Sequence, residues 1–390
     1  MLGKNYQSTE SIKIRVAILV WRDGFGGAER SIRDFAAALD QELLDVRFYF
    51  LSGDSSIFAH EITSLGYTVE FLHWKNGMSV AGRWRLLHRL RSFQPMIVHD
   101  HLIPPLTRPM VKLACKCPIV HTEHGEALRH ASGGGGWRKW IARLDLSFCE
   151  LVLANSKASF AAVQSAYGLL APKVQLLYLG IDLQRFDNIH RDRKRSMPMR
   201  VGYVGRIINS LKGVDYLPLV ARILCDMGCE SVEFVIVGDG PDRPIVETLC
   251  REFQVSHMFL FMGWRSDVQD LLASFDVVII PSRFESFGLV ALESLAMNVK
   301  VIGFEVDGLS EAVGNCSAAR LVPAGDVEGI AKLIVTEVTN LEQLPDSKGR
   351  EFVEEHFSSQ RMARDIERVY MDIVCSRSEG CEPRPRIVQM

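Results

Sequence analysis

Short apolar runs alternate with helical stretches along the first half of this 390-residue chain, and no other feature constrains its fold as strongly. The expected strands are 14–20, 45–51, 67–72, 96–99, 117–122, 150–154 and 174–179. Helices are expected between them, at 28–40, 56–65, 79–93, 103–115, 137–148 and 156–167. Because a strand–helix–strand connection joins parallel strands, the alternation predicts a parallel sheet with helices on both faces.

The same alternation begins again at residue 199, after the polar and basic stretch 188–198. The second set of expected strands is 199–204, 232–237, 258–261, 276–280, 299–304 and 320–322. The helices between these strands are expected to begin near 213, 241, 267, 288 and 309. The last three expected helices cover 326–337, 347–356 and 358–375. The stretch 188–198 has little to bury, so we interpret it as a linker. Since 390 residues exceed the usual size of one core, the sequence predicts an α/β protein with domains at 1–187 and 199–357 and a disordered tail, 376–390.

The composition is that of a soluble globular protein, with 47% hydrophobic and 24% charged residues. The net charge of −2 is divided unevenly, since residues 1–180 carry 21 Lys and Arg against 15 Asp and Glu, and residues 181–390 carry 24 against 32. A basic first half suits an anionic acceptor or an anionic membrane surface, although an uneven scatter of solvated charges explains it equally well. We expect no nucleic-acid partner, and the sequence indicates no oligomeric state.

The compartment is predicted from the apolar runs and the cysteines. The first apolar run, 14–20, is too short for a secretory signal, and no run approaches the 18 apolar residues of a membrane span. The nine cysteines lack the paired spacing of a zinc site. We therefore expect reduced thiols and a cytoplasmic protein, with contact at the inner membrane face as an option. That contact would involve the Trp- and Arg-rich segments 83–91 and 136–143. The alternative interpretation of these segments is two helices with a solvated face and with their Trp rings in the core.

The segment 281–293, Pro-Ser-Arg-Phe-Glu-Ser-Phe-Gly-Leu-Val-Ala-Leu-Glu, is the most informative motif. The apolar run 275–280 before it predicts a buried strand, and the run 289–297 predicts a helix. Glu285 is therefore expected at a strand's carboxyl end and Glu293 about two turns into the helix. The amides between them form a helix N-terminus that attracts phosphate, so the segment offers what binding of a sugar nucleotide requires. An ordinary strand–loop–helix with two solvated glutamates is the alternative.

This segment resembles the E-x7-E signature of the retaining glycosyltransferases of family 4, in the ordered pattern PS-x-x-E-x-FG-L-x-x-x-E-x-x-A. The resemblance extends over residues 14–375 and is weaker at 300–325. It implies the GT-B fold, in which two Rossmann-like, doubly wound parallel-sheet domains face each other across a cleft. The first domain would bind the acceptor, the second would bind the nucleotide-sugar donor, and the helix 358–375 would pack back on the first.

The same resemblance implies roles for the residues of this segment. Glu285 would bind hydroxyls of the donor sugar, and Glu293 would bind those of the ribose. The residues between them that would hold the donor are Ser286, Phe287, Gly288, Leu289 and Val290.

Arg206 follows a predicted strand in Val-Gly-Tyr-Val-Gly-Arg, and Lys212 opens Lys-Gly-Val-Asp-Tyr-Leu. The pair resembles the family's G-R-…-K-G-x-D-x-L, in which the Arg and Lys clamp the diphosphate and stabilise the leaving group. Six positions separate the two residues where the resemblance implies five, so we expect a bulge in the loop. Two surface cations are the alternative.

Three further glycine turns follow predicted strands. The loop 24–30 resembles the family's GG-A-E, which closes over the donor phosphates. Its Glu29 is expected to cap the next helix, and contact with the acceptor is the alternative. The segments 234–241 and 261–268 resemble the family's I-V-G-D-G-P turn and the wall beside the nucleobase. The donor-binding candidates in these turns are Gly26, Gly27, Gly238, Asp239, Gly263 and Arg265.

His124 lies in the segment 120–126, which resembles the family's T-x-H-G turn. The resemblance implies that its side chain faces the donor sugar, bonds the hydroxymethyl group and helps the acceptor to dock. A metal site is the alternative, formed by His99, Asp100, His101, His121 and His124. The metal–diphosphate signature Asp-x-Asp of the other main glycosyltransferase fold does not occur in the chain, so we expect no metal or other cofactor.

These motifs predict a retaining, metal-independent glycosyltransferase of hexosyl type, with Glu285, His124, Arg206 and Lys212 as catalytic candidates. Its predicted substrates are a nucleotide-sugar and a glycan or lipid-linked acceptor of cell-surface polysaccharide or glycolipid synthesis. Two other classes remain open, a nucleotide-sugar 2-epimerase of related fold and a catalytically silent nucleotide-sugar-binding protein.

Overall fold

The computed structural model divides the chain into two compact units. The residues that it describes are 13–22, 26–53, 57–77, 79–125, 136–167, 173–187, 189, 198–340 and 348–377. Unit 1 comprises residues 1–154, 163–175 and 363–390, and unit 2 comprises 155–162 and 176–362. The predicted linker and the predicted disordered tail fall largely outside the described residues.

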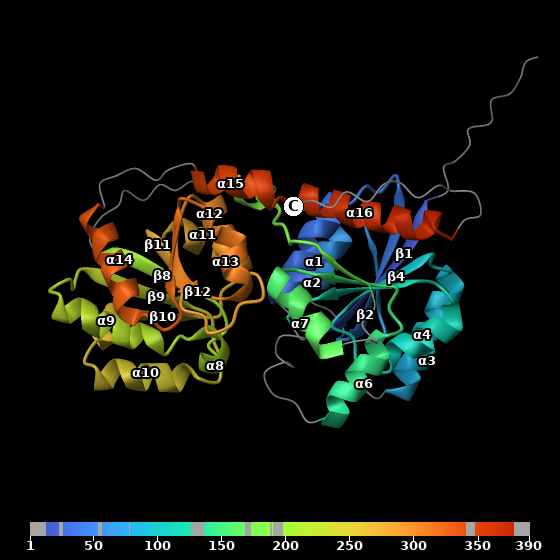
Figure 1. Cartoon of the computed structure of the whole chain (residues 1–390), viewed down its shortest axis with the longest axis horizontal. Coiled ribbons are helices and arrows are strands. Elements are labelled where there is room, and N and C mark those ends of the chain that lie inside the picture. The colour runs from blue at the N-terminus through green and yellow to red at the C-terminus, as the bar shows by residue number, and fades with distance from the viewer. Residues whose placement is uncertain are drawn as a thin grey trace, which may run out of the picture. The chain divides into compact units, whose positions relative to one another are not determined.

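Unit 1 is built on a seven-stranded sheet with the order β3-β2-β1-β4-β5-β6-β7 (Figure 1). Its strands are β1 (Ile14–Arg22), β2 (Leu44–Ser52), β3 (Thr68–Phe71), β4 (Ile97–His101), β5 (Ile119–Glu123), β6 (Leu151–Ala154) and β7 (Lys173–Leu176). Neighbouring strands from β3 to β6 pair in parallel. The order reverses between β1 and β4, and ligands of open α/β sheets bind at the carboxyl ends of strands beside such a point.

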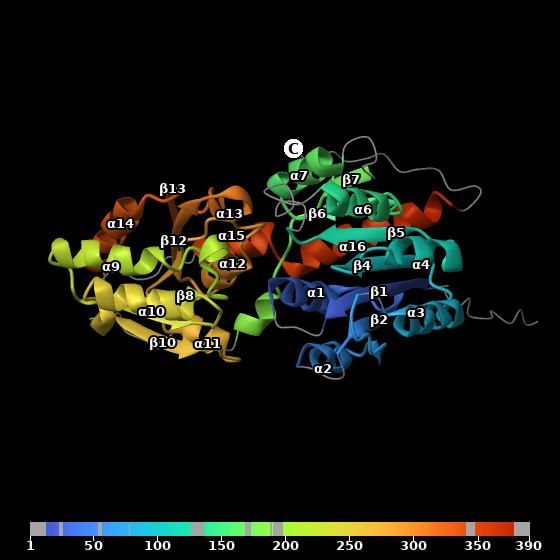
Figure 2. The same ribbon diagram turned by 90° about the horizontal axis from the view of Figure 1, so that it is seen from below.

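The helices of unit 1 cover both faces of this sheet. They are α1 (Gly27–Ala38), α2 (Ile57–Ser64), α3 (Val80–Phe93), α4 (Thr107–Cys115), α6 (Gly136–Leu146), α7 (Lys157–Tyr167), whose first turns belong to unit 2, and most of α16 (Ser359–Cys375). Successive side chains of a strand point to opposite faces of the sheet, so the partners of neighbouring residues on β4 show which helices cover each face. His99 packs on Phe35 of α1 and bonds Tyr370 of α16, whereas Asp100 is bound by Arg108 of α4. Helices α1 and α16 therefore cover one face, and α4 covers the other (Figure 2).

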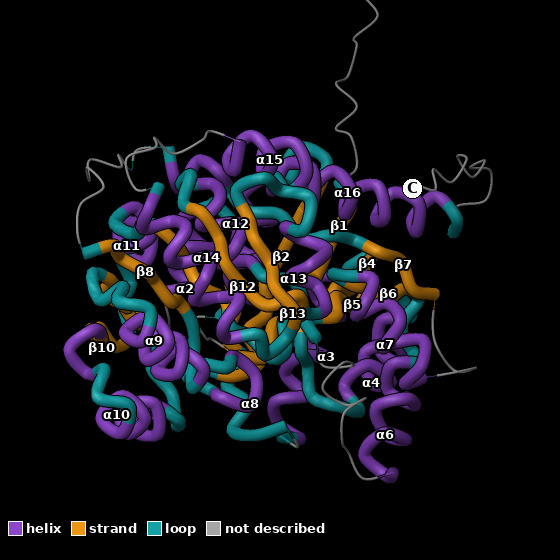
Figure 3. Tube along the Cα trace, turned by 60° about the vertical axis from the view of Figure 1, so that its left-hand side comes forward, coloured by secondary structure: helices purple, strands orange, loops and turns teal. Residues whose placement is uncertain are grey.

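Unit 2 contains a six-stranded sheet with the order β10-β9-β8-β11-β12-β13, in which all neighbours pair in parallel. Its strands are β8 (Met199–Val204), β9 (Val232–Val237), β10 (Phe259–Gly263), β11 (Val277–Ile280), β12 (Lys300–Glu305) and β13 (Ala319–Pro323). Its helices are α8 (Asn209–Lys212), α9 (Tyr216–Asp226), α10 (Arg243–Glu252), α11 (Val268–Ala273), α12 (Leu289–Ala296), α13 (Asp307–Val313), α14 (Val327–Thr339) and α15 (Lys348–His356), with 3-10 turns at Leu183–Phe186 and Ser256–Met258. Figure 3 shows β12 and β13 side by side, next to α12, α13 and α14.

The predicted fold class is confirmed, because both units are Rossmann-like parallel sheets with helices packed on them. The four residues of β11 are all buried, as expected for a central strand of a parallel sheet. Two expected boundaries were wrong, since the strand expected at 174–179 ends at Leu176. The helix predicted at 103–115 begins at Thr107, since Pro104 and Pro105 precede it and Leu106 takes a left-handed conformation with φ +66°. In the part of the chain that the structure describes, no helix is long and apolar enough to cross a membrane.

Candidate active site

Glu285 and Lys212, predicted from separate motifs, are joined in unit 2. The Nζ atom of Lys212 donates to Oε2 of Glu285 at 2.5 Å, and the Ser282 hydroxyl donates to the same oxygen at 3.2 Å. The amides of Arg283 and Phe284 both donate to the carbonyl of Leu211, at 2.9 and 3.0 Å. The loop after β11 is thus fastened to α8 one residue before Lys212, which sets the ammonium group against the carboxylate.

The six-position interval between Arg206 and Lys212 is occupied by the single-turn helix α8. The Tyr203 hydroxyl donates to the carbonyl of Arg206 at 2.9 Å and fixes its backbone. The guanidinium of Arg206 is exposed and forms no hydrogen bond or ion pair with any residue that the structure describes. It is therefore a cation at the carboxyl end of β8, beside β11, without a protein counter-ion in the described part of the chain.

The start of α12 presents a row of amides. Gly288 caps this helix in the left-handed region, with φ +102°, and a Cβ there would lie 2.9 Å from Leu309. The first amides bonded within the helix are those of Ala291 and Leu292, which donate to the carbonyl of Gly288. The preceding five amides, from Ser286 to Val290, donate to no described residue, so they can bind the oxygens of an anion.

The predicted ribose ligand Glu293 lies in the second turn of α12, just over one turn from its start, and is only 2% exposed. Phe287 is also buried, and its ring stacks on Tyr178 and meets Phe357 edge to face, with centroids 5.9 and 5.6 Å away. The side chain of Phe287 therefore supports the loop, and only its amide is available to a ligand. The ribose role of Glu293 stays a prediction.

The glycine turns after β8, β9 and β10 lie against one another. The amide of Gly238 donates to the carbonyl of Gly263 at 2.8 Å, and a Cβ on Gly238 would lie 2.0 Å from the carbonyl oxygen of Gly205. Gly238 has φ +129°, so both its conformation and its surroundings require glycine. These contacts bring the backbone after β9 directly beside the residue that precedes Arg206.

Two of the polar donor-binding candidates already have protein partners. Asp239 accepts from the amide of Gly240 at 2.8 Å and lies 3.6 Å from Arg243. The guanidinium of Arg265 donates twice to Asp267, at 2.8 and 2.6 Å. Both side chains stabilise their own turns, and their contact with a donor stays a prediction.

In unit 1, Gly26 is the N-cap of α1 and Gly27 is its first residue. The amide of Gly26 donates to Oε2 of Glu29 at 3.0 Å, so the prediction that Glu29 caps this helix is confirmed. Residues 23–25 of the same loop lie outside the described part of the chain. The predicted contact of Gly26 and Gly27 with donor phosphates stays a prediction.

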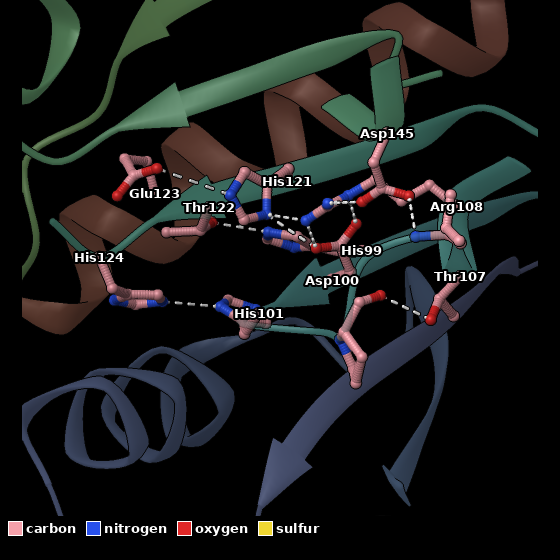
Figure 4. Close-up of polar contacts among 12 residues, drawn as sticks. His99, Asp100, His101, Thr107, Arg108, His121, Thr122, Glu123, His124 and Asp145 are labelled. Atoms are coloured by element: carbon pink, nitrogen blue, oxygen red, sulfur yellow. Dashed lines mark hydrogen bonds and ion pairs between the residues drawn. The ribbon is translucent and has the colours of Figure 1, made fainter. Parts of the chain in front are cut away.

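His124 lies at the carboxyl end of β5, and Figure 4 shows it paired with His101 at the end of β4. Nδ1 of His101 and Nε2 of His124 share one hydrogen bond of 3.0 Å. Burial lowers the pKa of His124 to about 4, and it places the pKa of His101 well below its usual value as well. Both rings are therefore neutral near pH 7 and each carries a single N–H. Nε2 of His101 is buried without a hydrogen-bond partner in the described structure.

A buried ionic network lies beside this pair, and the sequence motifs did not reveal it (Figure 4). Arg108 of α4 binds Asp100 with two hydrogen bonds, at 2.9 and 2.7 Å, and binds Asp145 of α6 at 2.5 Å. His121 donates from Nδ1 to Asp100 at 2.7 Å, and its Nε2 lies 3.9 Å from Glu123. Arg108 belongs to no recognised motif, and only its position in the first turn of the helix after β4 could have indicated a carboxylate partner.

The pKa values in this network follow from these pairings. Burial raises the pKa of the Asp100 carboxyl, but Arg108 and His121 outweigh it and hold that pKa below the usual range. Burial and Arg108 oppose the imidazolium of His121, but Asp100 and Glu123 prevail and raise its pKa to about 9. His121 is thus a buried cation at pH 7, whereas burial lowers the pKa of His99 to about 3 and keeps that ring neutral.

The alternative of a metal site at these histidines is not supported. His99 uses both ring nitrogens, with the Tyr370 hydroxyl at 2.6 Å from Nδ1 and the Thr122 hydroxyl at 2.7 Å from Nε2. Among the residues with a described position, no group of three or more His, Cys, Asp or Glu is arranged to hold a metal ion.

Comparison with known proteins identifies the family. The model described as Glycosyltransferase Family 4 matches residues 25–185, and the model described as Glycosyl transferases group 1 matches residues 198–340. The chain is 30% identical to N-acetyl-alpha-D-glucosaminyl L-malate synthase of Bacillus anthracis over an alignment of 342 residues. That alignment covers 83% of this chain and 86% of the relative. The chain belongs to glycosyltransferase family 4. The predicted family is thereby confirmed, and the protein is a transferase of GT-B type.

Solved structures of glycosyltransferases share the fold of this family 4 chain. HepE of Anabaena, solved in complex with UDP and glucose, aligns over 91% of this chain and 99% of its own, with a TM-score of 0.73 and 16% identity. A glycosyltransferase from Rickettsia africae aligns over 93% of this chain and 99% of its own, with a TM-score of 0.76 and 19% identity. At such identities the likeness establishes the fold alone.

Proposed function

We propose that this family 4 glycosyltransferase is a retaining, metal-independent enzyme that moves a sugar from a nucleotide-sugar to a glycan or lipid-linked acceptor. The observation that carries the proposal is the row of five free amides, from Ser286 to Val290, directly after the Glu285–Lys212 pair. Arg206, without a protein counter-ion in the described part of the chain, ends the adjacent strand. A diphosphate between the amides and the two cations would satisfy all of these groups.

The charge balance of the reaction supports independence from metal. The bond between the anomeric carbon of the donor and the diphosphate oxygen breaks, and negative charge builds on that oxygen. Arg206, Lys212 and the amides of the α12 N-terminus together supply the stabilisation that a divalent cation supplies elsewhere. Glu285, held by Lys212 and Ser282, is placed to accept hydroxyl hydrogens of the donor sugar.

We propose that the anomeric configuration of the donor sugar is retained because the transfer takes place on one face of that sugar, the front face. The acceptor oxygen bonds the anomeric carbon on the face that the diphosphate leaves, and the acceptor proton passes to the leaving phosphate oxygen. This path needs no protein base, and His124, whose pKa burial lowers to about 4, would be a weak one. His124, with one N–H and one acceptor nitrogen, suits a hydrogen bond to a sugar hydroxyl.

The related proteins support a nucleotide-sugar donor. HepE was solved with UDP and glucose, and the B. anthracis relative is named for an N-acetylglucosaminyl product. We propose a nucleotide-sugar as the donor and a cell-surface polysaccharide or glycolipid intermediate as the acceptor, handled in the cytoplasm.

The first test is thermal-shift binding of UDP, GDP, ADP and their common sugar conjugates, with and without EDTA. One nucleotide class should stabilise the protein by about 2.7 kcal/mol at 100 times its dissociation constant, and EDTA should not change the shift. Absence of a shift with every nucleotide would refute the donor site. Loss of the shift in EDTA would refute independence from metal.

The product distinguishes the remaining classes. Anomeric NMR of the product should show the configuration of the donor retained, and turnover should require an acceptor. Conversion of a UDP-sugar to a free sugar epimer without acceptor would identify a 2-epimerase. Tight binding without any turnover would identify a silent sugar-nucleotide-binding protein.

A further inference from the structure

Exposed apolar side chains gather on one part of unit 1. Among the described residues, thirteen large hydrophobic side chains are exposed, and six of them lie on or next to α3, α4 and α6. The six are Val80 (80% exposed), Trp84 (67%), Leu106 (47%), Leu113 (80%), Trp140 (60%) and Leu144 (36%). Single exposed apolar residues are ordinary, whereas a gathering of them marks an interaction surface. We call this surface the basic-aromatic face.

The three helices form one continuous surface. Helix α4 contacts both α3 and α6, and Figures 1 and 2 show the three together on unit 1. On α3, the residues Val80, Trp84, His88 and Arg91 recur every three or four positions, so they form one stripe along the helix. The rings of Trp84 and His88 stack at 5.6 Å within 5° of parallel, which holds the indole flat along the stripe.

The charge on this face has one sign. The three helices contain nine Lys and Arg and a single carboxylate, Asp145. Arg108 is buried between Asp100 and Asp145 and adds no charge to the surface, so these helices contain eight other cations and no other carboxylate. Arg91 and Lys116 are exposed and form no ion pair with any described residue.

Two carboxylates border the face without neutralising it. Glu70 pairs with Arg89 at 3.0 Å. Glu150 is shared between Lys112, at 3.8 Å, and Arg377, at 3.2 Å. Cations therefore remain in excess among the exposed apolar groups.

The face is also held rigid where α3 and α4 begin. Nη2 of Arg83 donates to the carbonyls of Gly77 at 2.7 Å and Pro105 at 3.1 Å. This side chain joins the segment before Val80 to the segment before Leu106. A surface that is ordered in advance binds without the cost of ordering it.

We propose that the basic-aromatic face docks unit 1 on an anionic lipid bilayer. Exposed Trp side chains occupy the headgroup region, Leu and Val enter the acyl boundary, and cations attract anionic lipids. A soluble polyanion would match the cations but leave Leu113 and Val80 in water, and an apolar protein groove would match the apolar groups but bury the cations. A bilayer surface satisfies both sets at once.

The position of the face relates docking to the acceptor. Val80 begins α3 and Leu106 immediately precedes α4, so both lie where helices start, at the carboxyl edge of the parallel sheet. His124 lies at the same edge of unit 1. The face continues to the opposite ends of these helices, at Arg91, Leu113 and Lys116, so docking would bring the whole layer of α3, α4 and α6 close to lipid. The inference rests on the proposed function only in that the acceptor would be lipid-linked.

The test is flotation of the full chain with large unilamellar vesicles. One set contains phosphatidylcholine alone, and the other contains 30% phosphatidylglycerol, at 50 and 500 mM salt. We expect binding to the anionic vesicles at 50 mM salt, loss of most of it at 500 mM, and little binding to phosphatidylcholine. No binding to anionic vesicles at low salt would overturn the proposal, whatever the result of the nucleotide tests.

Variants then assign the surface. Arg91→Glu with Lys116→Glu should weaken anionic-vesicle binding more than 20-fold, since each cation near the bilayer contributes about fivefold. Trp84→Ser with Trp140→Ser should weaken it by about tenfold or more. Ile57→Ser, on α2 of the same unit and 51% exposed, is the matched apolar control. Equal binding by all variants would overturn the assignment of this face, provided that their circular dichroism spectra match the wild type.

Discussion

At the scale of residues, the proposed donor site holds its charged side chains in two different ways. Lys212 and Ser282 both donate to one oxygen of Glu285, which leaves the other oxygen available to sugar hydroxyls. Arg206 is held only through its backbone, so its guanidinium is free to move onto a diphosphate. Glu285 would thus contribute through a fixed position, and Arg206 would contribute through its charge.

Glu285→Ala and Arg206→Ala are each expected to reduce kcat by roughly 100-fold or more, as loss of a transition-state contact does. Steady-state kinetics with the donor identified by thermal shift measure this. Lys332→Ala, an exposed cation on α14, is the control and should leave the rate unchanged. Near-normal turnover of either site variant would refute the assignment.

The buried His99 predicts a defined pH dependence of stability. Its pKa is about 3 in the folded chain because of burial, and about 6.5 when unfolded, so the unfolded state binds the proton first. Stability is therefore lost as the pH falls below about 6.5, by up to about 1.4 kcal/mol per pH unit for this residue. His99→Asn should reduce the slope of unfolding free energy between pH 6 and 4, measured with urea.

Thr122→Val provides the control for this slope, since it removes the hydrogen bond to Nε2 of His99 but keeps the imidazole. Both variants should be less stable than the wild type, and only His99→Asn should flatten the pH dependence. An unchanged slope in His99→Asn would mean that the ring is protonated in the folded state.

At the scale of elements, the one-turn helix α8 connects the two halves of the proposed donor site. It ends at Gly213, whose φ is +60° and whose missing Cβ would lie 2.0 Å from the carbonyl oxygen of Pro281. The loop after β11 returns hydrogen bonds to Leu211 in the same helix. The position of Lys212 therefore depends on a close approach that only glycine permits.

Gly213→Ala should destabilise unit 2 by clearly more than the ~1–2 kcal/mol that a left-handed alanine alone costs, and it should also weaken nucleotide binding, because α8 must move away from Pro281. The matched control is Gly228→Ala, which has φ +70° but no atom within 4 Å of its Cβ position. The control should show only the conformational cost, about 1–2 kcal/mol, with normal nucleotide affinity. Equal nucleotide affinity in both variants would contradict the role of α8.

At the scale of the whole molecule, the last described helix completes the first folded unit. Most of α16 belongs to unit 1, and the hydroxyl of Tyr370 on it shares a hydrogen bond of 2.6 Å with Nδ1 of His99 in β4, 271 positions earlier. The amide of Asp40 likewise donates to Glu367 at 2.7 Å. The strands of the first half of the chain are therefore not fully covered until the end of the chain is in place.

Tyr370→Phe should cost about 1–3 kcal/mol, since it leaves a buried imidazole nitrogen unsatisfied, and Tyr370→Ala about 3–5 kcal/mol. Hydrogen exchange should show the loss of protection in β4 and β5, far from the substitution in sequence. Met371→Ala, the exposed neighbour, should leave protection in β4 unchanged. Loss confined to α16 would mean that the helix is not part of unit 1.

Much of the fold could be predicted because its signals are local. Apolar runs of three to seven residues and the helices between them predicted two parallel sheets, and the order of residues 281–293 placed Glu285 after a strand and Glu293 inside a helix. The capping of α1 by Glu29 was likewise predictable, since a cap depends only on residues three positions apart.

The sequence by itself determined the strands, the helices and the family motifs, because each depends on neighbours within one element. Only the tertiary structure decided that Lys212 meets Glu285, that His101 pairs with His124, and that Arg108 joins Asp100 to Asp145. Those contacts depend on which strand ends are adjacent in the sheet and on which face each side chain points to. Hydrophobic periodicity specifies that a residue is buried, but the identity of its partner follows from strand order and packing.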